Sequence, residues 1–431
     1  MVERKPHTGP EKNSGYSPRS HDAAPQTGKT QTGSPLGETI AYHRRRRGMT
    51  QEVLAGLAGG RTADWLSKVE RGRISIDRLS VLEQLADALR IPVTRLIDRA
   101  GTHRTPAPAH QPDLEKLRET LADYSYLTAG TAPDSVDVDL DVLAAEIGEA
   151  WSAYQDSRYT RATRRLPEAI TNARRAVLTL EGTDKARAQA HLAMAYQGAA
   201  MVLTKIGESD LAWLAADRGL SAAFAADNHL VLGSLYRSVA HCLLANKHAD
   251  AAAATIDNAA TLIAPHARRG PDHLSVYGTL FLVGAMAAAR AGNRQETTAY
   301  LAYAQRAADE LGHDGNRLWT AFGPTTVRMH HVSAALELGD VETAIAQGER
   351  IDTSALPVER RVRHKLDLAR AHDARAHRET AETLLLDANE LAPEQVTGHY
   401  ITAALVKCWI RAPRDTPNPH ITALAQKLGL V

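Results

Sequence analysis

Aromatic side chains are scarce in this chain of 431 residues, which contains 3 phenylalanines, 5 tryptophans and 12 tyrosines. Aromatic and β-branched residues are the usual strand formers, whereas alanine and leucine favour helices. Of all residues 44% are hydrophobic, and alanine supplies much of that share. The composition therefore predicts an all-α fold, and the length is sufficient for two or more domains.

Long apolar runs, cysteines and catalytic signatures are also missing. The longest apolar run, from Leu280 to Ala289, has ten residues, about half of the roughly 20 that a membrane-spanning helix needs. Two cysteines, Cys242 and Cys408, cannot build a disulfide framework and favour a reducing cytoplasm. HExxH, GxSxG, Walker A and GxGxxG motifs are absent, so the sequence predicts no enzyme, no metal site and no cofactor.

Charge is divided unevenly along the chain, although the formal net charge is only +1. Residues 1–105 contain 18 Lys and Arg against 11 Asp and Glu, a balance of +7. Residues 106–431 contain 33 basic against 39 acidic residues, a balance of −6. A basic front segment indicates a polyanionic partner for that part of the chain.

Proline and glycine divide the chain into four segments. Residues 1–35 are rich in Pro, Gly, Ser and Thr and are predicted to form a disordered tail. Residues 36–99 are predicted to form a head of five short helices, and residues 100–112 (AGTHRTPAPAHQP) are predicted to form an extended linker. Residues 113–431 predict a domain of helical repeats.

A weak repeat runs through this last domain. A small or turn residue is followed five positions later by Ala or Thr, and an apolar helical run flanks the pair on each side. The pairs are Ser157/Ala162, Gly207/Ala212, Asn246/Ala251, Gly292/Thr297, Gly339/Ala344 and Ala376/Ala381. Helix pairs repeated in this way stack into an α-solenoid, because each pair buries its apolar face on its neighbours.

The segment MTQEVLAGLAGGRTADWLSKVERG, residues 49–72, carries the strongest functional signal. Two short helices around a glycine break are the pattern of a helix-turn-helix, whose second helix fits the DNA major groove. Thr50 can cap the first helix, and the second is predicted from about Thr62 to Glu70. Leu66 and Val69 would pack inward and leave the opposite face available.

The stretches LGETIAYHRRRRGMTQEVLA, LSKVERGR and LEQLADALRIPVTRLI resemble the Xre/lambda-repressor-type family of helix-turn-helix transcriptional regulators, over the whole of that family's domain. The resemblance implies a sequence-specific regulator that binds double-stranded DNA as a homodimer in a bacterial cytoplasm. By the same resemblance, Gln51 would contact a phosphate and brace the recognition helix, and Thr62, Ala63 and Trp65 would face base edges. Lys68, Arg71 and Arg73 would contact phosphates, and Glu70 would brace the domain.

Several side chains of this segment have a second interpretation. Trp65 could contact a thymine methyl group, or it could close the edge of the domain. Asp64 favours the positive end of its helix dipole, although it could also accept a bond from a cytosine amino group. The arginines at 44–47 cover about 300° of a helix, so they cannot all face DNA.

The rear domain also resembles a known architecture. Its residues Trp151, Tyr154, Tyr159, Ala162 and Pro167 are similar to a tetratricopeptide repeat. Such an array behind an Xre-type head is similar in plan to Gram-positive regulators that bind short signalling peptides in a concave groove. The resemblance implies DNA binding gated by a peptide, protein or small ligand, while the array could equally serve dimerisation.

Two other functions remain open from the sequence. One is a protein-interaction scaffold whose helix-turn-helix no longer binds DNA. The other is an enzyme in residues 113–431, which would require a buried polar pocket with converging titratable groups.

Overall fold

The computed structural model describes residues 35–74, 76, 79–89, 91, 96, 112–124, 138–411 and 418–431. Every regular element in these segments is a helix, so the all-α prediction is confirmed. The predicted tail before Pro35, the linker before Pro112 and most of the fifth head helix lie outside the described residues. None of the described helices combines the length and apolar character that crossing a lipid bilayer requires.

The described part of the head consists of α1 (Pro35–Arg46), α2 (Gln51–Leu57), α3 (Ala63–Glu70) and α4 (Leu79–Ala88). A glycine with positive φ follows each of α1 and α3, with φ of 64° at Gly48 and 69° at Gly72, and this conformation commonly ends a helix. Leu54, Leu66 and Leu85 from three of these helices are fully buried in one small core. This core fixes the relative orientation of α2 and α3.

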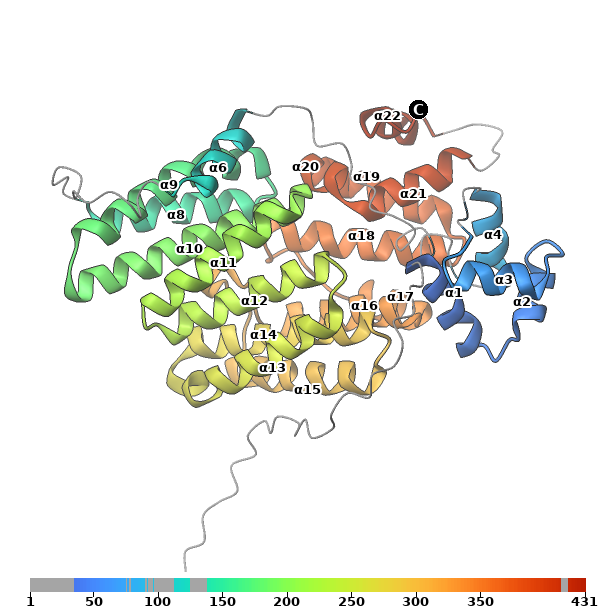
Figure 1. Ribbon diagram of the computed structural model, residues 1–431, viewed down its shortest axis with the longest axis horizontal. Helices are drawn as coiled ribbons and strands as arrows, with labels where there is room; N and C mark the ends of the chain where they lie inside the picture. The colour runs from blue at the N-terminus through green and yellow to red at the C-terminus, as the bar shows by residue number, and fades with distance from the viewer. Residues whose placement is uncertain are drawn as a thin grey trace, which may run out of the picture.

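The remaining described helices form the helical region, which we define as residues 112–431. They are α6 (Pro112–Ala122), α8 (Leu140–Gln155), α9 (Tyr159–Thr179), α10 (Gly182–Ile206), α11 (Ser209–Ala225), α12 (His229–Ala245), α13 (Ala249–Ile263), η1 (Ala264–Arg269), α14 (Pro271–Arg290), α15 (Arg294–Leu311), η2 (Arg317–Trp319), α16 (Pro324–Leu338), α17 (Val341–Gly348), α18 (Val358–Ala374), α19 (Arg378–Leu391), α20 (Pro393–Gly398), α21 (Tyr400–Arg411) and α22 (Pro419–Lys427). Neighbours in the chain pack as pairs, and successive pairs stack (Figure 1). The predicted α-solenoid of tetratricopeptide-like helix pairs is therefore confirmed.

Six turns within the helix pairs share one backbone conformation. Each contains a residue with φ between 59° and 87°, in the left-handed region: Ser157, Gly207, Lys247, Gly292, Gly339 and Ala376. The residue five positions later is at most 2% exposed in every case: Ala162, Ala212, Ala252, Thr297, Ala344 and Ala381. A small side chain is needed there because that position lies within the packed core of the pair.

The sequence prediction is wrong by one residue at the third of these turns. Asn246 is the C-cap of α12 rather than the left-handed residue, and Ala251 is exposed. Lys247 has φ of 66° and Ala252 is fully buried. Asparagine is a common left-handed residue, and the run of alanines that follows gives no means of choosing the register.

The helical region curves back so that its beginning and end touch. The Ser157 hydroxyl between α8 and α9 donates to Gln395 Oε1 on α20 at 2.6 Å. The segment between α15 and α16 also reaches α8, where the Trp319 ring stacks on Trp151 with centroids 5.2 Å apart. These contacts between residues distant in the sequence bring the early helices of the region against its later ones.

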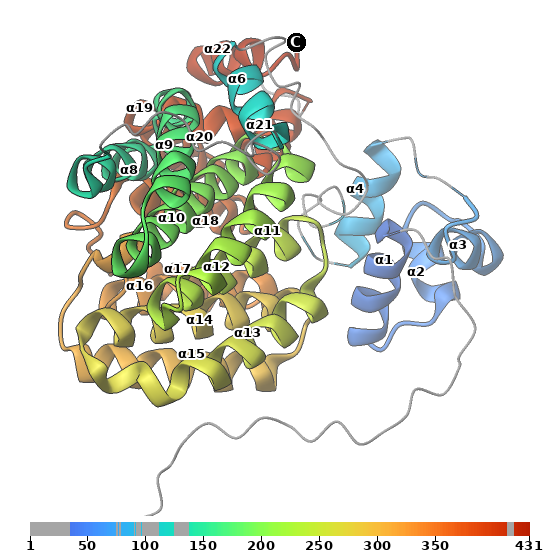
Figure 2. The same cartoon turned by 60° about the vertical axis from the view of Figure 1, so that its left-hand side comes forward.

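The head lies beside the helical region, with α1 and α4 on the near side and α2 and α3 on the far side (Figure 2). Cys408 of α21 packs against the core of the head. A second contact joins the Tyr42 side chain of α1 to the turn between α14 and α15. A Cβ atom on Gly292 would lie only 2.5 Å from the Tyr42 hydroxyl, so the two chains are in close contact there.

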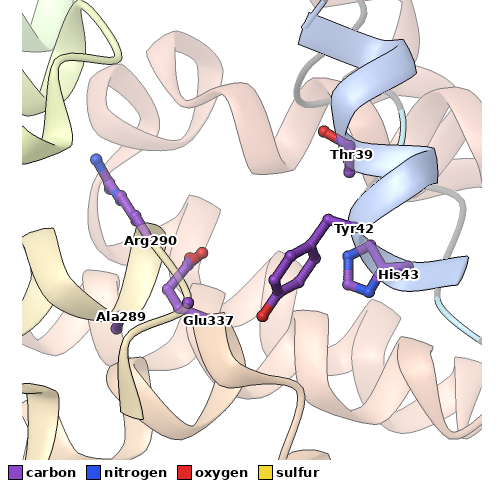
Figure 3. A pocket seen from close by; sticks show the side chains of 7 residues that line it. Thr39, Tyr42, His43, Ala289, Arg290 and Glu337 are labelled. Atoms are coloured by element: carbon purple, nitrogen blue, oxygen red, sulfur yellow. The ribbon is translucent and has the colours of Figure 1, made fainter. Parts of the chain in front are cut away.

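A small pocket marks this seam between the two parts (Figure 3). It is lined by Thr39, Tyr42 and His43 of α1 and by Ala289, Arg290, Gly292 and Glu337 of the helical region. The Tyr42 ring extends from α1 toward the helical region, as the close-up shows. The head is thus docked through the face opposite to its helix-turn-helix.

Candidate nucleic-acid interface

Threonine caps begin both helices of the helix-turn-helix. The Thr50 hydroxyl accepts a hydrogen bond from the Val53 amide at 3.2 Å, and the Thr62 hydroxyl accepts one from the Trp65 amide at 3.2 Å. Gly59, with φ of 89°, and Gly60, with φ of 70°, reverse the chain between the two helices. Side-chain caps satisfy amides that the first helical turn leaves unpaired. The local sequence therefore fixes where α2 and α3 start.

A buried network holds α3 against α1 and α2. Arg44 of α1 donates from Nε to Glu70 Oε1 at 2.6 Å and from Nη2 to Oε2 at 2.9 Å. Gln51 of α2 donates to Glu70 Oε2 at 2.7 Å, and Arg44 Nη1 donates to the Met49 carbonyl at 2.9 Å. The hydrogen bond to Glu70 raises the pKa of the Arg44 guanidinium. One carboxylate thereby joins three helices.

Gln51 therefore contacts the last residue of the recognition helix, at the location where bracing was expected. Its contact with a phosphate stays a prediction. The role of Arg44 was missed, because a run of four arginines gives no sign of which one turns inward. The signal that could have found it is Glu70, since a carboxylate placed to brace a domain requires a cation near it.

The outward face of α3 is small and mixed in charge. Thr62 and Asp64 are exposed, and Ala63 is half-buried at the first helical position. Lys68 pairs with Asp64 one turn away, with Nζ and Oδ2 at 2.6 Å. The ion pair lowers the positive charge that Lys68 presents to a phosphate, while Asp64 also lies in the first turn, where an acid is favourable.

Trp65 lies at the border between the core and the outer face. Its ring packs against the head core and is half-buried. The Arg61 guanidinium stacks over the ring, with its carbon 4.7 Å from the centroid. This packing matches the interpretation of Trp65 as the residue that closes the domain edge, and it places Arg61, which the sequence did not single out, beside the start of α3.

Arg71 and Arg73 follow the C-terminal end of α3, and both are exposed. Arg71 folds back on the helix, donating from Nε to the Ser67 carbonyl at 3.0 Å and from Nη2 to the Ser67 hydroxyl at 2.9 Å. To reach a phosphate, the Arg71 side chain has to break both of its hydrogen bonds to Ser67. Exposed bonds of this kind exchange readily with water.

In both overall views the described helices of the helical region lie on the other side of the head from α3 (Figures 1 and 2). The predicted site residues are not clustered around a cavity. Ala63, Trp65 and Lys68 lie on α3, Thr62, Arg71 and Arg73 flank its two ends, and Gln51 opens α2. An α-helix fits a major groove about 12 Å wide.

Comparison with solved structures finds similar helical arrangements at low identity. They include a Rap protein complexed with Competence and Sporulation Factor (12% identity, 84% of this chain and 100% of that chain, TM-score 0.46). Aspartyl phosphate phosphatase F from Bacillus subtilis is another (12% identity, 85% and 96%, TM-score 0.44). A third is Bacillus thuringiensis PlcR in complex with the peptide PapR7 and DNA (14% identity, 65% and 96%, TM-score 0.29).

No curated protein matches the chain. One family profile, described as a helix-turn-helix domain, matches residues 35–97. This segment begins with α1 and includes the capped helices α2 and α3 together with α4. The head is accordingly a helix-turn-helix domain, joined in this chain to a tetratricopeptide-like helical region.

Proposed function

We propose that the protein is a sequence-specific DNA-binding transcriptional regulator, gated by a ligand of the helical region. The observation that carries the proposal is the outer face of α3, which points away from the described helical region and is held in a fixed orientation by the buried bonds of Arg44 and Gln51 to Glu70. A rigid, exposed helix of a helix-turn-helix domain is what base readout in the major groove requires.

The proposed DNA contacts follow from the position of each side chain. Ala63 and the Thr62 methyl group face base edges, and Trp65 contributes its exposed edge. Lys68, Arg71, Arg73 and the free edge of Gln51 contact phosphates. Since phosphate contacts release counterions, affinity falls steeply as salt rises.

Gating is proposed to pass through the docked face of the head. The contact between Tyr42 and Gly292 and the packing of Cys408 on the head core link the two parts. A ligand that changes the curvature of the helical region would move these contacts and thereby the orientation of α3.

A homodimer would place two heads on half-sites about one helical turn of DNA apart. Trp213 and Phe224 support a dimer surface in the helical region, because they are 45% and 56% exposed and share one face of α11. Light scattering of the full chain measures the mass directly, and a monomer at micromolar concentration bound to DNA would contradict this part of the proposal.

Selection of fragments from the protein's own genome by the full chain tests DNA binding. We expect one enriched sequence with two half-sites, and a slope of affinity against salt that Lys68→Ala and Arg71→Ala each reduce by about one unit. Enrichment of no sequence would favour the scaffold function instead. The enzyme alternative required a buried group of titratable side chains in the helical region. The described residues contain such a group of buried charged side chains on α10, α12 and α18.

A further inference from the structure

Charged side chains gather in the interior of the helical region, where α10 and α12 face α18. We call this group the interior charge cluster; it consists of Lys205, Arg237, Glu359, Arg360, Arg363 and Asp367. The cluster contains four cations and two carboxylates. Charge of this kind is costly to bury unless each group has a partner.

Most members of the cluster have a partner. Lys205 forms an ion pair with Glu359, and Arg360 Nε lies 3.5 Å from the other oxygen of the same carboxylate. Arg363 Nε lies 3.3 Å from Asp367. These pairs use both carboxylates of the cluster.

The three histidines around the cluster carry no charge at neutral pH. Burial and the neighbouring arginines hold the pKa of His241 and His399 well below the usual range, and they lower the pKa of His330 to about 4. All three imidazoles are therefore neutral near pH 7. The cluster as a whole stays positive.

Arg237 differs from the other cations. Its side chain is 2% exposed, and its Nε and Nη2 atoms are buried without a hydrogen-bond partner among the described residues. Burial and the charge of Arg360 lower its pKa to about 10, so the guanidinium remains charged at neutral pH. A buried cation whose two donors lack a partner destabilises the folded state, so a role in folding does not account for Arg237.

The two unused donors define the shape of the missing partner. Nε and Nη2 lie on one edge of the planar guanidinium, with their N–H bonds parallel, and this edge matches the two oxygens of a carboxylate. The same protein shows the arrangement in its head, where Nε and Nη2 of Arg44 hold both oxygens of Glu70 at 2.6 and 2.9 Å.

We propose that Arg237 binds a carboxylate group of the regulatory ligand in the interior of the helical region, through its Nε and Nη2 edge. Arg360 adds positive charge beside the site. The inference deepens the ligand-gated part of the proposed function, because it assigns the ligand's chemical class. Binding itself is measured without DNA, so its failure is distinguishable from a failure of DNA recognition.

The test uses thermal unfolding of the full chain with sodium acetate and sodium succinate, at constant ionic strength set with sodium chloride. We expect a saturable rise in the midpoint temperature of the wild-type protein. Arg237→Met, which has no donor, and Arg237→Lys, which lacks the planar fork, should each lose this rise. No rise in the wild type, or a rise only with inorganic phosphate, would overturn the proposal.

Stability without ligand provides a second readout. Arg237→Met should be at least as stable as the wild type, because it removes a buried charge that lacks a partner. Arg174→Met is the matched control: Arg174 is equally buried, but it donates to the Tyr196 hydroxyl and the Thr120 carbonyl at 2.8 Å each. We expect the control to lose stability. An equal loss in Arg237→Met would assign Arg237 a structural role and overturn the inference.

Three sources of the carboxylate can be separated by synthetic pentapeptide pools. One pool has a free C-terminus, the second is the same pool amidated, and the third is amidated with one glutamate. Stabilisation by the first pool alone identifies a peptide terminus, and by the third a side chain. Stabilisation by succinate together with inactive pools identifies a small acid. Stabilisation by the amidated pool to the same extent as the others would contradict recognition of a carboxylate.

Discussion

At the scale of the residue, Arg44 connects α1 to the end of α3, because its guanidinium holds both oxygens of the buried Glu70 carboxylate. Four consecutive arginines predicted at most partial contact with DNA, and the structure turns Arg44 inward while Arg45 stays exposed. Helical geometry predicts that four such residues point in different directions. It does not say which direction is the interior, because that depends on the packing of α3 against α1.

Arg44→Ala should destabilise the head by about 3–5 kcal/mol, because it leaves the Glu70 carboxylate buried without its cation. Hydrogen exchange of α3 amides in the full chain measures the change. Arg45→Ala is the control and should change the free energy of local opening by less than about 0.5 kcal/mol. Equal exchange in the two variants would show that the Arg44 pair does not hold α3.

The interior histidines make stability depend on pH. The pKa of His330 is lowered to about 4 by burial and by Arg360, against about 6.5 in an unfolded chain. Between these two values the unfolded state binds more protons than the folded state, so the free energy of unfolding falls as pH drops from 6.5 toward 4. The Thr326 carbonyl and Asp367 oppose the shift without reversing it.

Urea unfolding at about pH 7, 6 and 5 measures this dependence. The first value lies above the pKa of about 6.5 in the unfolded chain, and the other two lie below it. His330→Gln should flatten the loss of stability, whereas His420→Gln, at an exposed position on α22, should leave it unchanged. A wild-type protein that is equally stable at all three values would contradict neutral burial of these histidines.

At the scale of the element, the helix-turn-helix and the paired helices were predictable because their signals are local. Caps, glycine stops and a small residue at a fixed distance all act within one turn or one pair. Lys247 shows the limit of such signals: a lysine in the left-handed region has no pattern of its own, and only packing of Ala252 selects it.

The shared turn geometry predicts opposite effects of two substitutions. Ala376→Gly should stabilise the chain by about 1 kcal/mol, because Ala376 is exposed and its φ of 61° is strained for any residue with a Cβ. Gly339→Ala should destabilise by a similar amount at φ of 87°, where the added Cβ meets no other atom. Chemical denaturation of the full chain measures both. Shifts of the same sign would refute the strain argument.

At the scale of the whole molecule, the docking of the head and the closure of the helical region could not be predicted. Both depend on pairs such as Tyr42 with Gly292 or Ser157 with Gln395, which are far apart in the sequence and carry no periodic signal. The sequence indicated which residues of α3 face outward, but not every contact that their side chains make. The ion pair between Lys68 and Asp64 is different, because it joins positions four residues apart on one helix, a spacing that is visible in the sequence.

Gly292→Ala should loosen the head, because its Cβ would collide with the Tyr42 hydroxyl. Gly339→Ala is the matched control, since it introduces a similar left-handed strain in open space. We expect hydrogen exchange in α1 to rise in the first variant and to stay at the wild-type rate in the second. An unchanged α1 in both variants would mean that Tyr42 does not hold the head in place.

Entry of α3 into the major groove is the central claim, and Ala63 tests it most directly. Ala63→Glu and Ala63→Gln have nearly the same shape, and an acid in the first turn favours the helix, so the two differ at the DNA mainly in charge. Fluorescence anisotropy of the full chain on its selected operator compares them. We predict at least a tenfold weaker affinity for the glutamate variant, which corresponds to about 1.4 kcal/mol. Equal affinity of the two variants would contradict the claim that α3 lies against the duplex.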